Sequence, residues 1–429
     1  MSVNRIIAPG FQQIENLPEI EYCSKTLTNG IPLYLLKEVE GEMIRVDFVT
    51  DGGTALTDDP LIALAANNLL TEGTTSKSAI KIAGQFDLFG AYVNKFVGSD
   101  HAGLSLYSLK RYLPEVLPLV KDILTAAVFP QSEIDIYLKN KKSKFLVNSE
   151  KPAVLTRRKM LNLLFGVNHP YGRTTSIDDF NNLNKHDIDE FFEKKYLHGN
   201  LNIFISGAYN EVDIQLIDGL FNKTEIKRER NSSGYLDIKN TGKPGRYFIK
   251  KKGAVQSSIR MGRLLFNIAH PDYPSFYFLN MLLGGYFGSR LMKNLREEKG
   301  YTYGIASGIV TNLHTGYLSI ATEVKREVTD KAVDEIFIEL KKLQTEPVPE
   351  EEMTTVRNYL MGRLLRDFDG PFAKTDRLRS VLPFGFDNDF FKSIATEARN
   401  ITKERVMEMA CRYFDADEMI VVISGEKKE

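Results

Sequence analysis

Residues 185–207 read KHDIDEFFEKKYLHGNLNIFISG, and residues 402–425 read TKERVMEMACRYFDADEMIVVISG. Each segment begins with a polar helix start and continues as an amphipathic helix to a basic residue followed by tyrosine and an apolar residue. Each then passes a polar turn and ends in an apolar strand closed by Ile-Ser-Gly. The two tyrosines, Tyr196 and Tyr413, lie 217 positions apart. Two such units, separated by about half of the chain, indicate an internal duplication.

A second pair of segments repeats at nearly the same distance. Gly103 opens a strand of alternating pattern that is followed by Lys-Arg and a helix, and Gly316 opens a segment with the same order. Lys110 and Lys325 are 215 positions apart. A single strand–helix unit often recurs by chance in a sequence. Two different pairs of segments rarely have nearly the same spacing by chance. The two pairs together therefore predict two homologous domains.

The composition changes between the two copies. Residues 224–245, TEIKRERNSSGYLDIKNTGKPG, are charged, rich in Ser and Gly and poor in large apolar residues, which is typical of a linker. We therefore expect an N-terminal domain over 1–223, a linker over 224–245 and a C-terminal domain over 246–429. The chain length of 429 residues fits this division, because single cores rarely grow beyond about 250–300 residues.

Strands and helices mix within each half. Residues 22–27 and 31–37 alternate in polarity and flank Asn29-Gly30, a strong signal for a hairpin turn. A doubly wound parallel sheet needs stricter alternation of strand and helix. The pattern instead favours an α+β fold, in which each domain has a largely antiparallel sheet with helices packed mainly on one face.

Charge and composition exclude several classes of function. Lys+Arg and Asp+Glu are both 56, and a net charge of zero argues against a protein that binds nucleic acid or anionic membranes. Two distant cysteines, Cys23 and Cys411, build no disulfide framework or cysteine-rich metal site. The N-terminus lacks the apolar core of a signal peptide, and no segment approaches the ~20 apolar residues of a membrane span. We therefore expect a soluble, cytoplasmic protein.

Residues 51–78, DGGTALTDDPLIALAANNLLTEGTTSKS, contain a well-marked helix. Asp59 can cap it, Pro60 suits its first position and Gly73 is expected to end it. This run resembles the first motif block of the pitrilysin/insulinase-type zinc metallopeptidases, in which a helix carries His-x-x-Glu-His shortly before Gly-Thr. In that family the two histidines bind zinc and the glutamate polarises the attacking water.

Counted back from Gly-Thr, the family's motif positions fall on Leu64, Asn67 and Asn68. Leu64 has no donor atom, Asn67 takes up no proton near neutral pH, and Asn68 is a poor zinc ligand compared with imidazole. The family's third ligand, a glutamate on a later helix, corresponds to Lys144, whose charge would repel a cation. The six histidines form no other metal motif. We therefore expect no metal in this chain.

Residues 284–303, GGYFGSRLMKNLREEKGYTY, depart less from the family. Arg296 is predicted near the end of a helix that Gly300 stops, and Tyr303 is predicted to open the next strand. Family members carry Ser-Arg-Leu, then Arg, then Tyr at this spacing, and the pair reaches across a cleft to the zinc site. The resemblance implies that Arg296 and Tyr303 bind substrate backbone and stabilise the developing oxyanion. Taken without the family, a helix-end arginine and a strand tyrosine are ordinary structural residues.

The resemblance covers nearly the whole chain and implies a division of labour. Some bacterial members pair a zinc-bearing chain with a chain that lacks the motif but supplies Arg and Tyr. We therefore expect a non-catalytic, substrate-binding subunit of a heterodimeric zinc peptidase that degrades peptides, with zinc held by a homologous partner. The alternative is an inactive structural or peptide-binding scaffold, as in the core subunits of respiratory complexes that resemble this family. The histidine spacing disfavours an active peptidase that uses a different metal site.

Overall fold

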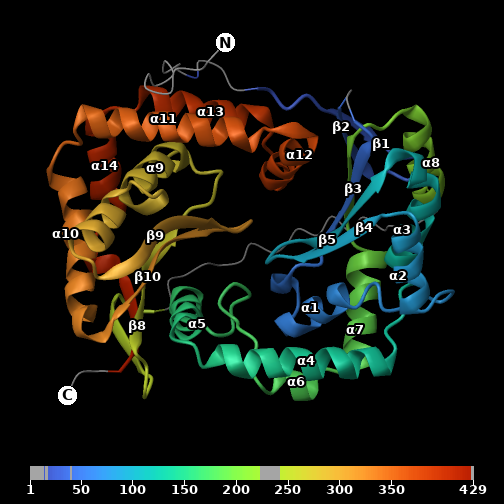
Figure 1. The fold of residues 1–429 in the computed structure, drawn as a ribbon, viewed down its shortest axis with the longest axis horizontal. Coiled ribbons are helices and arrows are strands. Elements are labelled where there is room, and N and C mark those ends of the chain that lie inside the picture. The colour runs from blue at the N-terminus through green and yellow to red at the C-terminus, as the bar shows by residue number, and fades with distance from the viewer. Residues whose placement is uncertain (1–13, 15–17, 39–40, 223–241, 427–429) are drawn as a thin grey trace, which may run out of the picture.

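The computed structural model describes residues 14, 18–38, 41–222 and 242–426 (Figure 1). Most of the predicted linker, residues 224–241, lies outside the described residues, so the division into domains stays a prediction. Below, the N-terminal half means the described residues up to 222, and the C-terminal half means those from 242. Among the described residues, no helix combines the length and apolar character that crossing a membrane requires.

Each half contains one β-sheet. The N-terminal sheet has six strands in the order β1-β2-β6-β3-β5-β4, and the C-terminal sheet has five in the order β7-β11-β8-β10-β9. The strands of the first are β1 (Cys23–Thr26), β2 (Pro32–Lys37), β3 (Met43–Thr50), β4 (Tyr92–Val97), β5 (Ala102–Leu109) and β6 (Leu201–Gly207). Those of the second are β7 (Gly245–Lys250), β8 (Gln256–Leu265), β9 (Thr302–Thr311), β10 (Gly316–Lys325) and β11 (Ile420–Gly425).

Helices follow the same division. Those of the N-terminal half are α1 (Pro60–Asn68), α2 (Ala79–Leu88), α3 (Leu113–Ala126), α4 (Gln131–Ser149), α5 (Pro152–Phe165), α6 (Asp179–Asn182), α7 (Lys185–Phe192) and α8 (Glu211–Phe221). Those of the C-terminal half are α9 (Tyr273–Asn280), α10 (Thr329–Thr345), α11 (Glu350–Asp367), α12 (Gly370–Val381), α13 (Asn388–Asn400) and α14 (Lys403–Tyr413). The described residues also form five short 3₁₀ helices and three π-helical segments, the latter at Glu193–Leu197, Met281–Gly285 and Met292–Glu298.

The sheets confirm the predicted α+β class. Neighbouring strands run antiparallel except for two pairs, β2 with β6 and β7 with β11. The predicted hairpin is present, because β1 and β2 pair antiparallel around Gly30, whose φ of 90° is the left-handed conformation that glycine adopts readily.

The duplication is visible in the topology. The order β2-β6-β3-β5-β4 of the first sheet corresponds to β7-β11-β8-β10-β9 of the second, and the parallel pair falls at the same place in both. Near the start of both repeated strands only glycine fits, because a side chain would collide with a neighbouring carbonyl oxygen. A Cβ on Gly103 would lie 1.9 Å from the carbonyl oxygen of Phe48, and one on Gly316 would lie 2.1 Å from that of Phe266.

Alternation along the strands gives each sheet two apolar faces. In β6, Ile203 and Ile205 pack with helices of the N-terminal half, whereas Phe204 faces the other way and packs with Leu378 and Val381 of α12. In β11, Val421 and Ile423 pack with helices of the C-terminal half. Ile420 and Val422 of β11 lie on the opposite face and pack with Met160 and Leu164 of α5.

In each half, therefore, one helix packs against the open face of the other half's sheet. Figure 1 shows α5 against the C-terminal sheet and α12 beside the N-terminal sheet. The helices of each half lie mainly on one face of its own sheet, as predicted, but no sequence pattern predicted this exchange. This exchange joins the two halves through apolar contacts at two places, α12 on the N-terminal sheet and α5 on the C-terminal sheet.

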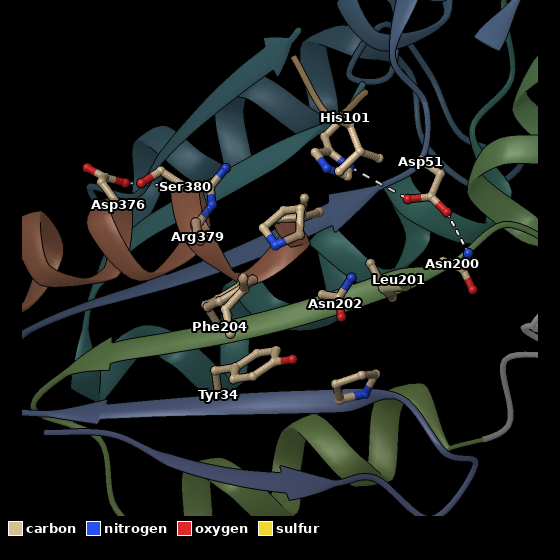
Figure 2. A pocket seen from close by; sticks show the side chains of 15 residues that line it. Tyr34, Asp51, His101, Asn200, Leu201, Asn202, Phe204, Asp376, Arg379 and Ser380 are labelled. Atoms are coloured by element: carbon tan, nitrogen blue, oxygen red, sulfur yellow. Dashed lines mark hydrogen bonds and ion pairs between the residues drawn. The ribbon is translucent and has the colours of Figure 1, made fainter. Parts of the chain in front are cut away.

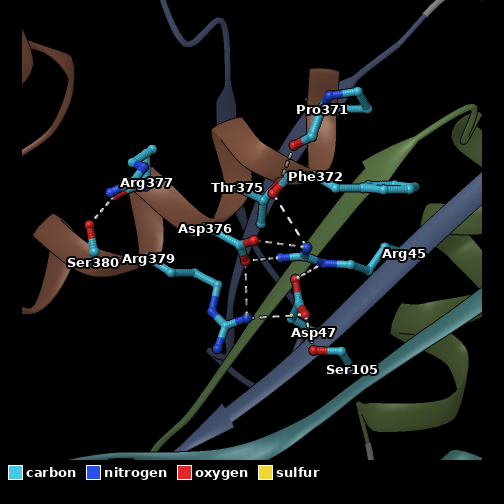
Figure 3. A network of polar contacts seen from close by, with 10 residues as sticks. All are labelled: Arg45, Asp47, Ser105, Pro371, Phe372, Thr375, Asp376, Arg377, Arg379 and Ser380. Atoms are coloured by element: carbon cyan, nitrogen blue, oxygen red, sulfur yellow. Dashed lines mark hydrogen bonds and ion pairs between the residues drawn. The ribbon is translucent and has the colours of Figure 1, made fainter. Parts of the chain in front are cut away.

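A buried polar network accompanies α12 (Figure 3). Arg45 and Asp47 of β3 are 2% and 0% exposed, and Arg45 Nε donates to Asp47 Oδ2 at 2.8 Å. From α12, Asp376 accepts a hydrogen bond of 2.5 Å from Arg45 Nη2, and Arg379 Nη1 lies 3.2 Å from Asp47 Oδ1. Burial opposes the charge on Arg45, but the two carboxylates outweigh burial and raise its pKa. Charges that would be costly if buried alone are thus paired across the two halves.

Candidate functional site

The resemblance assigns the first half of the family's active site to α1, a helix that begins as predicted. The Asp59 side chain accepts from the backbone N–H of Leu61 at 2.8 Å, and Pro60 is the first helical residue. The helix ends at Asn68, however, and not at Gly73. Leu70 N–H bonds to Asn67 and Glu72 N–H bonds to Leu69, and these i→i+3 bonds turn the chain out of the helix before the glycine.

Asn67, which the resemblance aligns with the family's catalytic glutamate, is 1% exposed. Its side-chain amide donates to the carbonyl oxygen of Gly103 at 2.9 Å and to the hydroxyl of Tyr196 at 2.8 Å. Both amide hydrogens are therefore used to tie α1 to β5 and to the π-helical segment 193–197. The partner tyrosine is the one that marks the sequence repeat, and its counterpart Tyr413 donates to Asp272 at 2.6 Å.

Asn68, which the resemblance aligns with the second histidine, has a cationic environment. The Lys95 ammonium of β4 donates to the backbone oxygen of Asn68 at 2.5 Å and to Thr71 Oγ1 at 2.7 Å. Glu72 lies 3.9 Å away from this ammonium. Burial lowers the pKa of Lys95, and the nearby Glu72 opposes that shift. A lysine ammonium directly beside the motif position repels a divalent cation.

Leu64 is partly buried on α1, and Lys144 is exposed on α4. The α4 side chain that approaches Asn68 is Tyr137, whose hydroxyl lies 3.5 Å from the Asn68 amide nitrogen. No described contact joins Lys144 to Asn67 or Asn68. The donor set is thus apolar, amide and cationic, and it does not fit zinc. Among the described residues, no group of three or more His, Cys, Asp or Glu is placed to hold a metal.

We expect the purified chain to bind zinc only in substoichiometric amounts. Neither Leu64 nor the two amides at Asn67 and Asn68 supply a strong ligand, and the Lys95 ammonium opposes a cation. The measurement is inductively coupled plasma mass spectrometry after incubation with excess zinc and gel filtration. One tightly held zinc per chain would show that this interpretation of α1 is wrong.

The segment that carries Arg296 is helical and ends where predicted, but it is a π-helix over Met292–Glu298. Lys299 N–H bonds to Asn294 at 2.9 Å and Tyr301 N–H bonds to Leu295 at 2.8 Å. Gly300 has a φ of +64°, a conformation that favours glycine, and it turns the chain into β9. Single π-helical turns occur frequently at functional sites.

Arg296 differs from its neighbour Arg290 in how its charge is neutralised. Arg290, part of the Ser-Arg-Leu block, forms two hydrogen bonds of 2.9 and 2.8 Å with Glu352 of α11. The Arg296 guanidinium lies 4.3 Å from the centre of the Phe287 ring, and no carboxylate among the described residues is within ion-pair distance of it. Arg290 therefore fixes the helix, whereas Arg296 is free to bind an anion or a carbonyl oxygen.

Tyr303 projects from a β-bulge at the start of β9. Thr302 pairs with Val324 and Ile305 pairs with Thr322, so Tyr303 and Gly304 contribute an extra residue opposite β10. The bulge is fixed by hydrogen bonds of 2.9 Å from the Thr322 hydroxyl to the Thr302 hydroxyl and to the Gly304 carbonyl. Bulges of this kind redirect a side chain, and Tyr303 is 93% exposed as a result.

A pocket of about 330 Å³ adjoins Tyr303. It is lined by Ala153, Gln256, Ser258, Arg260, Thr302, Tyr303, Gly304, Ala321, Thr322 and Glu323. Apart from Ala153 at the start of α5, these residues come from β8, β9 and β10. Arg296 does not line the pocket, and neither do the α1 positions, so within one chain the structure does not join Tyr303 to the degenerate metal motif.

A larger cavity of about 660 Å³ lies in the seam between the N-terminal sheet and α12 (Figure 2). Tyr34 and Phe204 stack along one wall with ring centres 4.7 Å apart. Its charged groups are already paired: Asp51 lies 3.6 Å from His101 and accepts from Asn200 at 2.5 Å, and Arg379 contacts Asp47. His101 is thus part of an ordinary polar contact, and the charged groups named here are neutralised within the cavity.

The residues that sequence reasoning missed are Lys95, Tyr137 and Arg260. A signal existed for Arg260, because it is a charged residue inside the strand-like run SSIRMG. Lys95 and Tyr137 approach α1 from distant strand and helix positions. No local pattern could have identified these two.

Comparisons with known proteins agree with this geometry. A family model described as the peptidase M16 inactive domain matches residues 182–360, which include Arg296 and Tyr303 but not the α1 positions. Relatives named as uncharacterized zinc proteases are 22% identical in Rickettsia felis, over 92% of both chains, and 22% identical in Bacillus subtilis (YmxG), over 83% of this chain and 86% of the relative.

Two crystal structures share the fold. The peptidase M16 inactive domain from Pseudomonas fluorescens superimposes with a TM-score of 0.86 at 20% identity, over 95% of this chain and 98% of that one. A protease from Helicobacter pylori gives 0.85 at 16% identity, over 95% and 100%. With the motif order and the duplicated fold, these matches lead to one conclusion: residues 182–360 match the peptidase M16 inactive domain, and the chain as a whole resembles the M16 peptidases, the pitrilysin/insulinase-type metallopeptidases.

Proposed function

We propose that this chain is the non-catalytic, substrate-binding subunit of a two-chain zinc peptidase that degrades peptides. A homologous chain with an intact His-x-x-Glu-His motif would hold the zinc. The observation that carries the proposal is a contrast within one molecule. On α1, the Asn67 side chain and the Asn68 backbone oxygen form hydrogen bonds with Tyr196 and Lys95. The polar groups of Arg296 and Tyr303, by contrast, remain available to a ligand.

Arg296 and Tyr303 suit the two demands of peptide hydrolysis that a partner chain can meet. A guanidinium without a carboxylate partner can bind a peptide carbonyl or carboxylate with charge-assisted hydrogen bonds. The Tyr303 hydroxyl, carried outward on its bulge, can donate a hydrogen bond to the oxygen that becomes negative when water attacks the amide. The exposed Phe287 beside Arg296 adds an apolar surface for a peptide side chain.

The competing function is that of an inactive scaffold of the same fold. The degenerate α1 is compatible with both functions. A scaffold, however, has no use for a tyrosine that is 93% exposed on a fixed bulge, because the free energy of folding gains little from it. The presence of Arg296 and Tyr303 in these settings therefore favours the substrate-binding subunit.

Mixing the chain with a homologue from the same organism that carries His-x-x-Glu-His tests the proposal. We expect a heterodimer on gel filtration, and we expect hydrolysis of a quenched fluorescent peptide that neither chain produces alone. Light scattering gives the mass of the complex. A complex that forms without any gain in hydrolysis would favour the scaffold function. If no such homologue forms a complex with this chain, both functions are contradicted, because each requires assembly with a partner.

A further inference from the structure

Arg260 of β8 has an unusual environment in the pocket beside Tyr303. Gln256, Ser258 and Arg260 alternate along β8, and all three line the pocket. Arg260 Nη1 donates to the Ser319 hydroxyl at 3.0 Å, whereas its buried Nε has no hydrogen-bond partner. Among the described residues, no carboxylate lies within ion-pair distance of this guanidinium.

Three other arginines with little exposure are neutralised by carboxylates. Arg45 contacts Asp47 and Asp376, Arg290 binds Glu352, and Arg263, three positions further along β8, contacts Glu418. Arg260 instead feels the positive charge of Arg157 on α5. Burial is the largest cause that lowers the pKa of Arg260; Tyr317 opposes this shift, and Arg157 adds to it. A largely buried positive charge without a counterion is costly to folding and attracts an anion.

The pocket is small and is bounded by α5 and by Tyr303. Its volume of about 330 Å³ is near the lower limit of small-ligand pockets, about 300–1,000 Å³. The helix α5 bounds one side, because Ala153 lines the pocket and Thr156 Oγ1 lies 3.1 Å from Ser258 Oγ. The exposed Tyr303 stands at another side, and the exposed Glu323 is the one carboxylate among the lining residues.

We propose that this pocket binds a peptide carboxylate, with Arg260 as its anchor and Tyr303 at its entrance. A guanidinium and a carboxylate match in charge and in planar hydrogen-bonding geometry. The α-carboxylate at a peptide's C-terminus suits the pocket better than an acidic side chain, because a chain end needs no exit on the far side. The inference rests on the proposed function, since it assumes that peptides reach Tyr303, and it adds a preference for substrates with a free C-terminus.

Fluorescence anisotropy of N-terminally fluorescein-labelled hexapeptides tests this inference on the full chain. The peptides share one uncharged sequence and end in a free carboxylate, in an amide, or in an amide preceded by Asp. We expect the free acid to bind about 10- to 100-fold more tightly than the amide, the range of one or two charge-assisted hydrogen bonds. Binding of the Asp-amide peptide as tight as that of the free acid would assign the site to acidic side chains and overturn the C-terminal preference.

Two matched variants separate binding from folding. Arg260→Gln is expected to abolish the difference between free acid and amide while leaving the Tm unchanged or higher, because it removes an uncompensated charge. Arg263→Gln, which breaks the contact with Glu418 on the same strand, is expected to lower the Tm and keep the difference. Equal affinity of wild-type protein for acid and amide overturns this inference and leaves the proposed function standing. No binding of any peptide at millimolar concentration contradicts both.

Discussion

Asp47→Asn is expected to lower the free energy of unfolding by about 3–5 kcal/mol, the range for removing one partner of a buried ion pair. Asp47 is 0% exposed, accepts hydrogen bonds from Arg45 and from the Ser105 hydroxyl, and forms an ion pair with Arg379 of α12. The variant leaves Arg45, itself 2% exposed, without its buried carboxylate partner. Urea unfolding followed by circular dichroism gives the change in free energy.

Asp376→Asn is the matched control for Asp47→Asn. Asp376 also contacts Arg45, but its side chain is 58% exposed, so water replaces much of what the variant loses. We expect a cost of at most about 1 kcal/mol, as for exposed ion pairs. Similar losses for the two variants would indicate that α12 does not shield this network from water.

Tyr303→Phe is expected to reduce peptide hydrolysis by the mixed two-chain enzyme about 100-fold, which is typical for the loss of one hydrogen-bond donor to a developing oxyanion. Because the side chain is 93% exposed, the substitution should change neither the Tm of this chain nor its assembly with the partner. The measurements are kcat/KM with a quenched peptide and gel filtration of the mixture. Arg296→Ala should lower kcat/KM as well, with part of its effect in KM, because it removes contacts made in the ground state.

Tyr92→Phe provides the control for the loss of an exposed tyrosine hydroxyl. Tyr92 is 62% exposed on β4, the strand that corresponds to β9 in the other half, and the proposal gives it no role in transition-state stabilisation. Its variant should hydrolyse peptides at the wild-type rate. Full hydrolysis by both Tyr303→Phe and Arg296→Ala would show that the pair is structural, and the scaffold function would then be the better one.

Features encoded by neighbouring residues could be predicted. The turn at Asn29-Gly30, the start of α1 at Asp59 and the turn into β9 at Gly300 each depend on a few adjacent residues, and all three are present. The duplication was visible because the same local patterns occur twice. The end of α1 was misplaced at Gly73 because backbone hydrogen bonds turn the chain earlier than the glycine does.

Features that depend on distant residues could not be predicted. Counting along the sequence selected Lys144, but only the packing of α4 shows that Tyr137 is the residue that meets Asn68. Whether an arginine is neutralised also depends on the tertiary fold. Arg260 and Arg263 look alike in the sequence, yet Arg263 contacts Glu418 and Arg260 faces a pocket. The bulge that exposes Tyr303 arises from its pairing with β10, which the strand's own residues do not reveal.

The helix exchange between the halves constrains how the chain folds on the ribosome. The N-terminal sheet is synthesised long before α12, which covers its open face with Leu378 and Val381. Until α12 emerges, Arg45 and Asp47 remain hydrated, and the apolar side chain of Phe204 on this face lacks its cover. The nascent N-terminal half therefore acquires its own helical core first and reaches its final packing only after release of the second half. A chain truncated before Gly370 lacks this cover permanently, and such uncovered apolar sheet faces are prone to aggregate.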